Sequence, residues 1–377
     1  MKYFFVYILL FYLLANVYLF VRGWMALERL PFLRFFFTIV VVVLLISPFL
    51  AIALEGSFSY HISLLTNKLA YSWMILFIYL FLLTICFDLL GLLFVKTHII
   101  QGYIANSRDK VRLFVFLGIL IFVFLTAVGG YIRFIHPNVT DYQSITSLKN
   151  SGNPIKKRVV FVSDMHLGYV ITKNDAQKFT NLINAQKPDI VIFGGDLIDR
   201  SLLPVFEEKM YEELVQINAS DGVFGVYGNH ERISNQDSLV NDFYQKCNIR
   251  LLKDEKVVIN GKIALFGRDD ATNKKRVPVD AIAQGIDTSQ FNIIVDHQPS
   301  DIDNISQTNT DLLLCGHTHN GQIFPGNWIV NRLFKLAHGK KKFNNTEVIV
   351  SSGIGVCGGK FRIGTSSEIV VFEIVIR

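Results

Sequence analysis

Four long apolar runs restrict what this chain can fold into more than any other feature of its sequence. Each has about 20 residues or more, the length that an α-helix needs to cross the roughly 30 Å hydrocarbon core of a bilayer. A cleaved signal peptide would explain the first run but not the other three, and buried helices of a soluble domain would show a polar face. We therefore predict four transmembrane helices, over residues 3–21, 35–54, 70–95 and 113–132.

The distribution of basic residues predicts the orientation of these helices. Three arginines lie in the first loop and four basic residues in the third, whereas the second loop contains only Lys68. Short loops rich in lysine and arginine stay in the cytoplasm, so everything after residue 132 is expected outside it. Arg133 and a group of basic residues in 149–158 argue for the opposite orientation.

Asp88 is the single charged residue within these runs. An ionisable group inside a membrane helix is a functional hint by default. The alternative, which we favour, is a carboxylate near a helix end that pairs with Lys96 or reaches water at the headgroups. The runs hold no further charge, so the sequence offers no path for protons or ions.

The character of the chain changes after residue 134. Residues 135–157 are rich in Pro, Asn, Ser and Gly, which predicts a polar linker. Residues 158–377 alternate short apolar strands with helical patterns, and the later strands follow one another more closely. Such alternation indicates parallel βαβ units, and the closer strands indicate a mixed sheet. We thus expect a membrane region (1–134), a linker (135–157) and an α/β domain (158–377).

Five polar fragments each follow a predicted strand of that domain, where ligand sites gather in α/β sheets. Any one of them can be a turn or a helix cap, but five that are rich in Asp, Asn and His indicate a shared metal centre. Carboxylate, amide and imidazole ligands suit Mn, Fe or Zn rather than a thiolate site, so Cys315 is expected to be strand packing. The fragments are 163–166 (SDMH), 194–199 (GGDLID), 228–231 (GNHE), 296–299 (DHQP) and 315–322 (CGHTHNGQ).

This series resembles the calcineurin-like metallophosphoesterases, whose motifs it matches in order over about residues 155–377. Two of the fragments, GGDLID and GHTHNGQ, look like the membrane-associated bacterial branch of that family. The resemblance implies an αββα sandwich with two mixed sheets, placed after the four-helix transmembrane region. It also implies a location in the bacterial inner membrane, with the catalytic domain on its outer side if the loop charges decide the orientation.

The resemblance further implies two divalent metal ions, with manganese, iron or zinc as candidates, and a metal-bridging hydroxide that attacks phosphorus. His230 resembles the catalytic histidine of the family. Asp196 would bridge the two ions and count among the catalytic residues. The remaining ligands would be Asp164, His166 and His319 for one ion, and Asn229, His297 and His317 for the other.

Other segments have two readings each. Glu231 either orients His230 or is an exposed carboxylate in the first turn of a helix. Arg268 either contacts a substrate phosphate or is a solvated loop charge. Residues 324–345 form either a lid or membrane-facing flap, or an amphipathic hairpin packed on the core. The segment Cys357-Gly358-Gly359 departs from the family's usual loop, which leaves the substrate pocket undefined.

We expect a membrane-anchored phosphohydrolase that cleaves a phosphodiester or pyrophosphate bond in an envelope or lipid-linked substrate, because the anchor keeps the site near the bilayer. An alternative is a UDP-2,3-diacylglucosamine-type pyrophosphate hydrolase, which requires a cytoplasmic domain. A non-enzyme alternative is a transport or sensor membrane module with a regulatory head. The net charge of +6 is not clustered, so nucleic acid is not an expected partner. The sequence predicts neither the oligomeric state nor a preference between monoesters and diesters.

Overall fold

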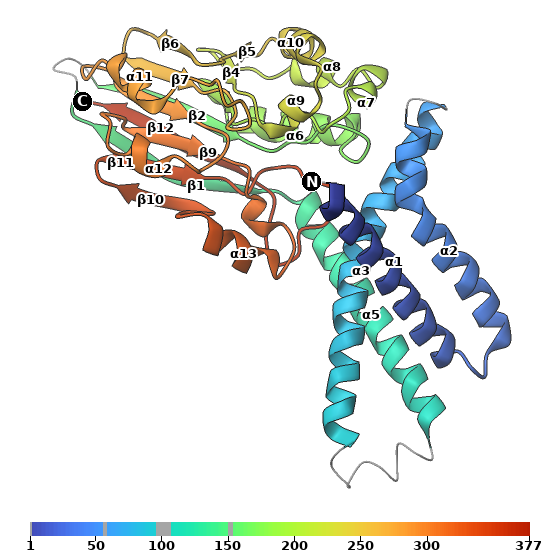
Figure 1. The fold of residues 1–377 in the computed structure, drawn as a ribbon. Coiled ribbons are helices and arrows are strands. Elements are labelled where there is room, and N and C mark those ends of the chain that lie inside the picture. Colours follow the sequence, from blue (N-terminus) through green and yellow to red (C-terminus); the bar gives the residue numbers. More distant parts are fainter. Residues whose placement is uncertain (1, 56–58, 96–106, 150–153) are drawn as a thin grey trace. The chain divides into compact units, whose positions relative to one another are not determined.

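The computed structural model describes residues 2–55, 59–95, 107–149 and 154–377. The chain divides into two compact units, Met1–Gly129 and Gly130–Arg377. The boundary falls inside the last membrane-length helix, so the second unit begins with the final turns of that helix. Figure 1 shows the helices and strands of both units.

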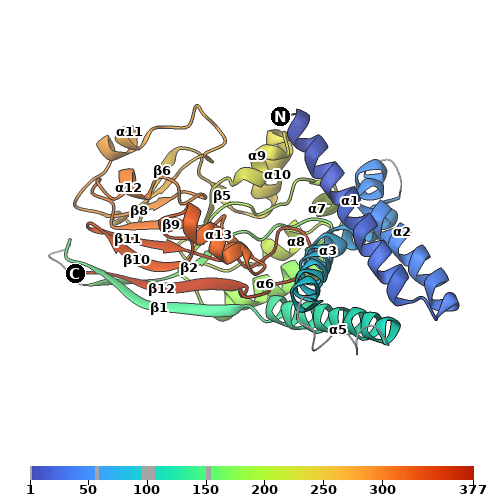
Figure 2. The same cartoon turned by 60° about the horizontal axis from the view of Figure 1, so that its bottom comes forward.

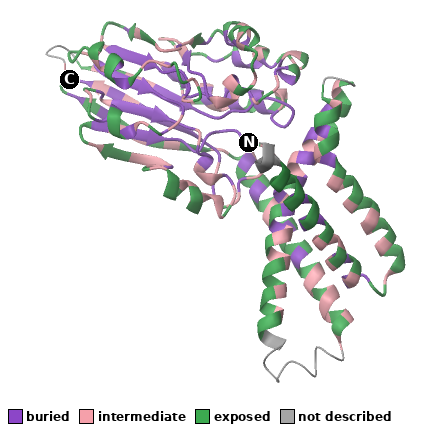
Figure 3. Cartoon of the chain, viewed as in Figure 1, coloured by how far each residue is buried: buried purple, intermediate pink, exposed green. Residues whose placement is uncertain are grey.

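The first unit is built from apolar helices, as the sequence predicts. Each of the four helices in the described part of the chain is long and apolar enough to cross a membrane. Many residues of these helices are exposed (Figure 3). The exposed residues are largely apolar, which suits a surface that faces lipid rather than water. The helices are α1 (Lys2–Ala26), α2 (Pro31–Leu54), α3 (Tyr60–Val95) and α5 (Arg108–Ile135).

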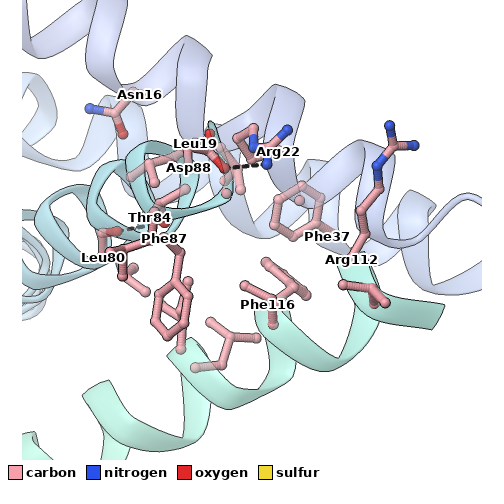
Figure 4. Close-up of a pocket in the computed structure, with 18 of the residues that line it drawn as sticks. Asn16, Leu19, Arg22, Phe37, Leu80, Thr84, Phe87, Asp88, Arg112 and Phe116 are labelled. Atoms are coloured by element: carbon pink, nitrogen blue, oxygen red, sulfur yellow. Dashed lines mark hydrogen bonds and ion pairs between the residues drawn. The ribbon is translucent and has the colours of Figure 1, made fainter. Parts of the chain in front are cut away.

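Asp88 on α3 pairs with Arg22 on α1 at the wall of a cavity of about 940 Å³ between the helices (Figure 4). The Tyr18 hydroxyl also donates a hydrogen bond of 2.5 Å to Asp88. Lys96, the partner expected from the sequence, lies outside the described residues. A carboxylate held by two groups of a neighbouring helix is a packing contact, which supports the structural interpretation of Asp88.

We expect Asp88→Asn to destabilise the helical unit by about 1 kcal/mol, because Arg22 then lacks its counter-ion inside the helix bundle. Thermal unfolding of the full chain in detergent micelles would measure the loss. The matched control is Asp109→Asn, which removes an ion pair of 2.7 Å to Arg29, whose side chain is 74% exposed. Exposed ion pairs contribute little to stability. Equal losses of stability in the two variants would therefore contradict a stabilising role for Asp88.

The second unit contains two six-stranded sheets in the described residues, ordered β1-β12-β2-β3-β4-β5 and β10-β11-β9-β8-β7-β6. Both sheets are mixed, because β12 runs antiparallel to β2, and the β6–β7 and β10–β11 pairs are antiparallel, while the other pairs are parallel. The first sheet consists of β1 (Asn138–Ser147), β2 (Ile155–Val162), β3 (Ile190–Phe193), β4 (Val223–Gly225), β5 (Arg250–Leu251) and β12 (Glu368–Ile376). The second consists of β6 (Glu255–Ile259), β7 (Ile263–Gly267), β8 (Phe291–Val295), β9 (Leu312–Cys315), β10 (Gly339–Phe343) and β11 (Thr346–Val350).

The sheets pack face to face around one apolar core, to which β2 contributes Phe161 and β9 contributes Leu314. The outer face of the second sheet is covered by α11 (Val279–Gln284) and α12 (Ile302–Ile305), which lie together on one side of the domain in Figure 2. The other helices are α6 (Lys173–Ala185), α7 (Leu203–Glu207), α8 (Tyr211–Leu214), α9 (Asn229–Ile233), α10 (Asp237–Lys246) and α13 (Gly326–Leu333). This arrangement is the sandwich with two mixed sheets that the resemblance implied.

The predicted linker is wrong for residues 138–147, which form β1 and pair in parallel with β12. The sequence did not reveal this strand because it lies at the sheet edge and is mostly exposed, with only Ile145 and Ser147 buried. An edge strand does not need the apolar alternation by which strands are recognised. The helix α5 ends at Ile135 and β1 begins at Asn138, so the α/β domain follows the last membrane-length helix almost directly.

Candidate metal centre

The five polar fragments meet at one edge of the sandwich because they follow strands that run parallel within each sheet. In the first sheet, β2, β3 and β4 are parallel neighbours, and in the second sheet β8 and β9 are. Parallel strands place their carboxyl ends side by side. The side chains delivered there are Asp164 and His166 after β2, Asp196 after β3, Asn229 after β4, His297 after β8, and His317 and His319 after β9.

One group of possible metal ligands consists of Asp164, His166 and His319, all buried. The Nε2 atoms of the two histidines are 3.0 Å apart, and Asp164 Oδ1 is 3.5 Å from His319 Nε2. Such a separation is compatible with two imidazoles that bind one cation at about 2.1 Å. The three side chains therefore converge on a point that a divalent cation fits.

A second group consists of Asp196, His297 and His317. His297 Nε2 lies 3.2 Å from Asp196 Oδ2 and 3.2 Å from Asn229 Oδ1. The other ring nitrogen of His297, Nδ1, is 2.8 Å from the Gly194 carbonyl oxygen. A hydrogen bond donated by Nδ1 leaves the Nε2 lone pair free for a cation, which is the usual arrangement of metal-binding histidines.

Asp196 lies between the two groups. Its Oδ2 atom is 3.2 Å from His297 Nε2 and 3.8 Å from His166 Nε2. Burial alone would lower the pKa of His297, but the charges of Asp196 and Asp164 outweigh it and raise that pKa to about 10. The buried carboxylates thus attract positive charge strongly, and either protons or metal cations can supply it.

Five of the seven expected ligands have a left-handed backbone. Residues other than glycine rarely adopt positive φ, which costs on the order of 1 kcal/mol or more for each residue. Such strain clusters at functional sites, where the surrounding structure holds the chain in place. The residues are Asp164 (φ 56°), His166 (φ 52°), Asp196 (φ 51°), His317 (φ 69°) and His319 (φ 49°).

Two glycines let the fragments approach one another. A Cβ atom at Gly228 would lie 2.1 Å from Asp196 Oδ1, and one at Gly316 would lie 1.8 Å from Ser163 Oγ. Both distances are far shorter than any contact between such atoms. The glycines of the GNHE and CGHTHNGQ fragments are therefore needed for close packing of the loops that carry the ligands.

Glu231 stands in the first turn of α9, as one of the two interpretations had it, but it is fully buried rather than exposed. None of its described hydrogen bonds reaches the His230 ring. Its carboxylate accepts four backbone N–H groups, from Asp196, Leu197, Ile198 and Gly228, at 2.7 to 3.1 Å. Burial and the nearby Asp196 charge raise the pKa of Glu231 to about 7. Glu231 thus fixes the loop after β3 and so positions Asp196.

We expect Glu231→Gln to lower the free energy of unfolding by roughly 2–4 kcal/mol, because the glutamine amide group would face backbone donors that then lack an acceptor. Denaturation of the metal-free chain would measure the loss without any contribution from bound cations. The matched control is Glu212→Gln, since Glu212 forms an exposed ion pair with Lys173 on the same domain. Wild-type stability in Glu231→Gln would contradict the anchoring role.

His230 is oriented by Asp199, the last residue of the GGDLID fragment, for which the sequence alone indicated no role. His230 Nδ1 and Asp199 Oδ1 are 2.8 Å apart, and His230 Nε2 is 4.0 Å from Asp196 Oδ2. Burial lowers the pKa of His230, but hydrogen bonds to Asp199 and Cys357, together with the charges of Asp196 and Asp199, raise it to about 11. His166, Asp199 and His230 also form a third group with metal-ligating atoms close together.

The interpretation of Arg268 as a solvated loop charge is wrong, whereas its contact with a substrate phosphate stays a prediction. The residue is only 2% exposed, and its guanidinium donates to Asp296 at 2.6 Å and to Asp301 at 2.9 Å. These ion pairs hold the chain on either side of His297. Cys315 is buried in the core of the second sheet, as expected for strand packing.

Arg362 is a buried residue of the site that the sequence analysis missed. Its guanidinium donates to the carbonyl oxygens of His319, Ser352 and Gly353 at 3.0, 2.7 and 2.8 Å. Burial lowers its pKa to about 10. Arg362 ties the loop that carries His319 to the loop after β11. A single arginine outside any motif gave no signal in the sequence.

Comparison with known proteins adds independent findings. The family model for calcineurin-like phosphoesterases matches residues 157–321. An uncharacterised metallophosphoesterase of Aquifex aeolicus is 30% identical over 243 residues, which cover 63% of this chain and 91% of that protein. One of Campylobacter jejuni is 30% identical over 227 residues, covering 58% of this chain. A transmembrane protein with metallophosphoesterase domain of Bos taurus is 27% identical over 292 residues, covering 71% of this chain. The matches span 59% of the Campylobacter protein and 64% of the bovine one.

Proposed function

The chain belongs to the calcineurin-like metallophosphoesterase family, and we propose that it hydrolyses a phosphodiester or pyrophosphate bond with two divalent cations bound side by side. The observation that carries this proposal is the position of Asp196 Oδ2, within 3.8 Å of ligand atoms from both groups. Asp196 would be shared by the two cations. Asp164, His166 and His319 would complete one site, and Asn229, His297 and His317 the other.

Bound there, two divalent cations would acidify a water molecule and neutralise the oxygens of the phosphoryl group. The chain's own contribution to bond cleavage would come from His230. Asp199 occupies Nδ1 of His230, so Nε2 is left to face the cluster and to donate a proton to the leaving oxygen. The raised pKa keeps His230 protonated at neutral pH, and nearby cations would bring that pKa down toward the range useful for a general acid.

We place the substrate at the membrane, as an envelope or lipid-linked phosphoester. The four membrane-length helices and the short connection from α5 to β1 support this, because they keep the α/β domain close to a bilayer. The loop charges favour a domain on the outer side of a bacterial inner membrane. A cytoplasmic domain would instead favour a substrate such as a nucleotide-linked diacyl sugar.

The test uses the full chain purified in detergent, stripped with a chelator and reloaded separately with Mn²⁺, Fe²⁺ or Zn²⁺. We expect two cations per chain and metal-dependent hydrolysis of bis(p-nitrophenyl) phosphate or of a lipid pyrophosphate. A stoichiometry of one cation, or no hydrolysis with any metal, would contradict the proposal. A matched assay with p-nitrophenyl phosphate separates monoester from diester cleavage.

Membrane topology decides which substrates can reach the site. A reporter that is active only outside the cytoplasm, fused after Arg377, should be active if the loop charges set the orientation. A silent reporter, together with an active fusion to a cytoplasmic reporter, would place the domain inside. The nucleotide-linked alternative would then become the leading one.

A further inference from the structure

The helix α13 exposes an apolar face beside the metal centre. The side chains of Trp328, Ile329 and Leu333 are 67%, 60% and 71% exposed, and no residue of α13 is buried. Phe324, just before the helix, is 42% exposed and contacts the Trp328 ring at 4.9 Å between centroids. The alternative of an amphipathic hairpin packed on the core therefore fails for α13, although β10, which follows, does join the second sheet.

The exposed apolar side chains of α13 lie on one side of the helix. At 3.6 residues per turn, Trp328, Ile329 and Leu333 fall within an arc of about 140°. Asn331 lies outside that arc, about 160° around the helix from Ile329, and the exposed Arg332 lies within it. An arginine on an apolar face can keep its charge at the headgroups while its stem stays among apolar groups. Trp, Ile and Leu beside Arg is the composition of a helix that lies in a membrane interface.

Contacts within the second unit connect α13 to the C-terminal end of α5. The Gly130 carbonyl of α5 accepts a hydrogen bond of 3.0 Å from Arg362 N. The next residue, Ile363, pairs with Ile323, and Phe324 N donates to the Ile363 carbonyl at 2.7 Å. Only the segment of Arg362 and Ile363 thus separates the last turns of α5 from Phe324, two residues before α13.

The end of α5 marks the level of the bilayer surface. The helix has 28 residues, a length of about 42 Å, which exceeds the roughly 30 Å hydrocarbon core. Its uncharged stretch ends at Ile132, and Arg133 follows. Gly130 therefore lies near the point where α5 leaves the hydrocarbon, and α13 begins one segment away from that point.

We propose that α13 docks on the lipid surface of the membrane that the same chain spans, with Trp328, Ile329 and Leu333 in the boundary between headgroups and acyl chains. The helix is short and would bind a bilayer weakly by itself. The membrane-spanning helices hold it at a high effective concentration near the surface, so a small apolar face is sufficient.

Docking of α13 has a consequence for the metal centre, which rests on the proposed function. The Phe334 ring lies 6.1 Å from the His317 ring, and Thr318 donates a hydrogen bond of 2.5 Å to the Ala337 carbonyl. A docked α13 therefore brings His317 to the level of lipid headgroups. Phosphoesters at the membrane surface would reach the site without leaving the bilayer.

The test measures tryptophan fluorescence of the full chain in nanodiscs, and it does not depend on activity. The difference between the wild type and Trp328→Phe isolates the signal of Trp328 from that of the two tryptophans in α1 and α3. We expect lipids brominated near the headgroup end of the acyl chain to quench this signal, and acrylamide in the water to leave it largely unquenched. Quenching by acrylamide but not by the brominated lipids would overturn the proposal.

A matched pair in the Trp328→Phe background tests the direction of the face. Ile329→Trp should be quenched by brominated lipid, whereas Asn331→Trp, about 160° away around the helix, should be quenched by acrylamide. Both positions are exposed, so the larger side chain meets no core packing. Equal quenching at the two positions would overturn the docking geometry. If α13 is docked but the chain has no hydrolytic activity, the proposed function is refuted and the docking of α13 is not.

Discussion

Replacing Asp196 by asparagine should abolish hydrolysis and prevent full metal loading. The substitution keeps the shape of the side chain, and its Oδ1 can still accept the hydrogen bond that His230 N donates at 2.8 Å. What it removes is the negative charge at Oδ2, the atom between the two groups of ligands. Changing a residue that only supports a metal ligand lowers metal affinity or activity about 10–100-fold. We expect the loss of a shared ligand to lower them by more than that.

Metal analysis and turnover should be measured on the same Asp196→Asn sample. We expect fewer than two cations per chain, with turnover at the background of the metal-free protein. The matched control is Asp242→Asn on α10, which removes only an exposed ion pair with Lys246. Undiminished turnover in Asp196→Asn would refute the assignment of a two-metal site, because that assignment requires the Asp196 carboxylate to be shared by both cations.

The apolar helices and the alternation of strands and helices were predictable because they rest on patterns that repeat along the chain, whereas the two-sheet sandwich was implied by the family resemblance. Uncharged runs of membrane length and short apolar strands leave few alternatives. The strand β1 was missed because its side chains are mostly solvated, and its partner β12 lies more than 200 residues later in the chain. Pairing over such a separation leaves no local pattern.

The candidate ligands were found because metal chemistry restricts residue types more than folding does. Asp164, Asn229 and His317 stand in short motifs whose order matches a known series. The supporting residues were missed because backbone atoms are their partners. Glu231 is bound by four backbone N–H groups and Arg362 donates to backbone carbonyls, and no sequence pattern records such contacts. The interpretation of Arg268 as a solvated charge failed because its partners, Asp296 and Asp301, are brought to it only by the fold.

Replacing His230 by alanine should leave both cations bound and remove most of the catalytic rate. His230 lies next to Asn229 but directs its ring toward Asp199 and Asp196. A general acid contributes about 10²–10⁴-fold to the rate, and we expect a loss in kcat of that size with little change in metal content. A lost cation in this variant would make His230 a ligand instead.

The pH profile separates proton donation from a purely structural effect of His230. The folded-state pKa of His230 is raised above its ordinary value, to about 11, so the proton is held at neutral pH and lost as the pH rises through the folded pKa. The wild-type rate should therefore fall on the alkaline side, at a pH below 11 once cations are bound, and His230→Ala should lack this decline. Asp199→Asn provides the matched variant, because it keeps the imidazole but weakens the contact that raises its pKa, and its alkaline decline should shift to lower pH. An alkaline decline that is unchanged in all three proteins would assign the proton to another group and leave His230 with an electrostatic role alone.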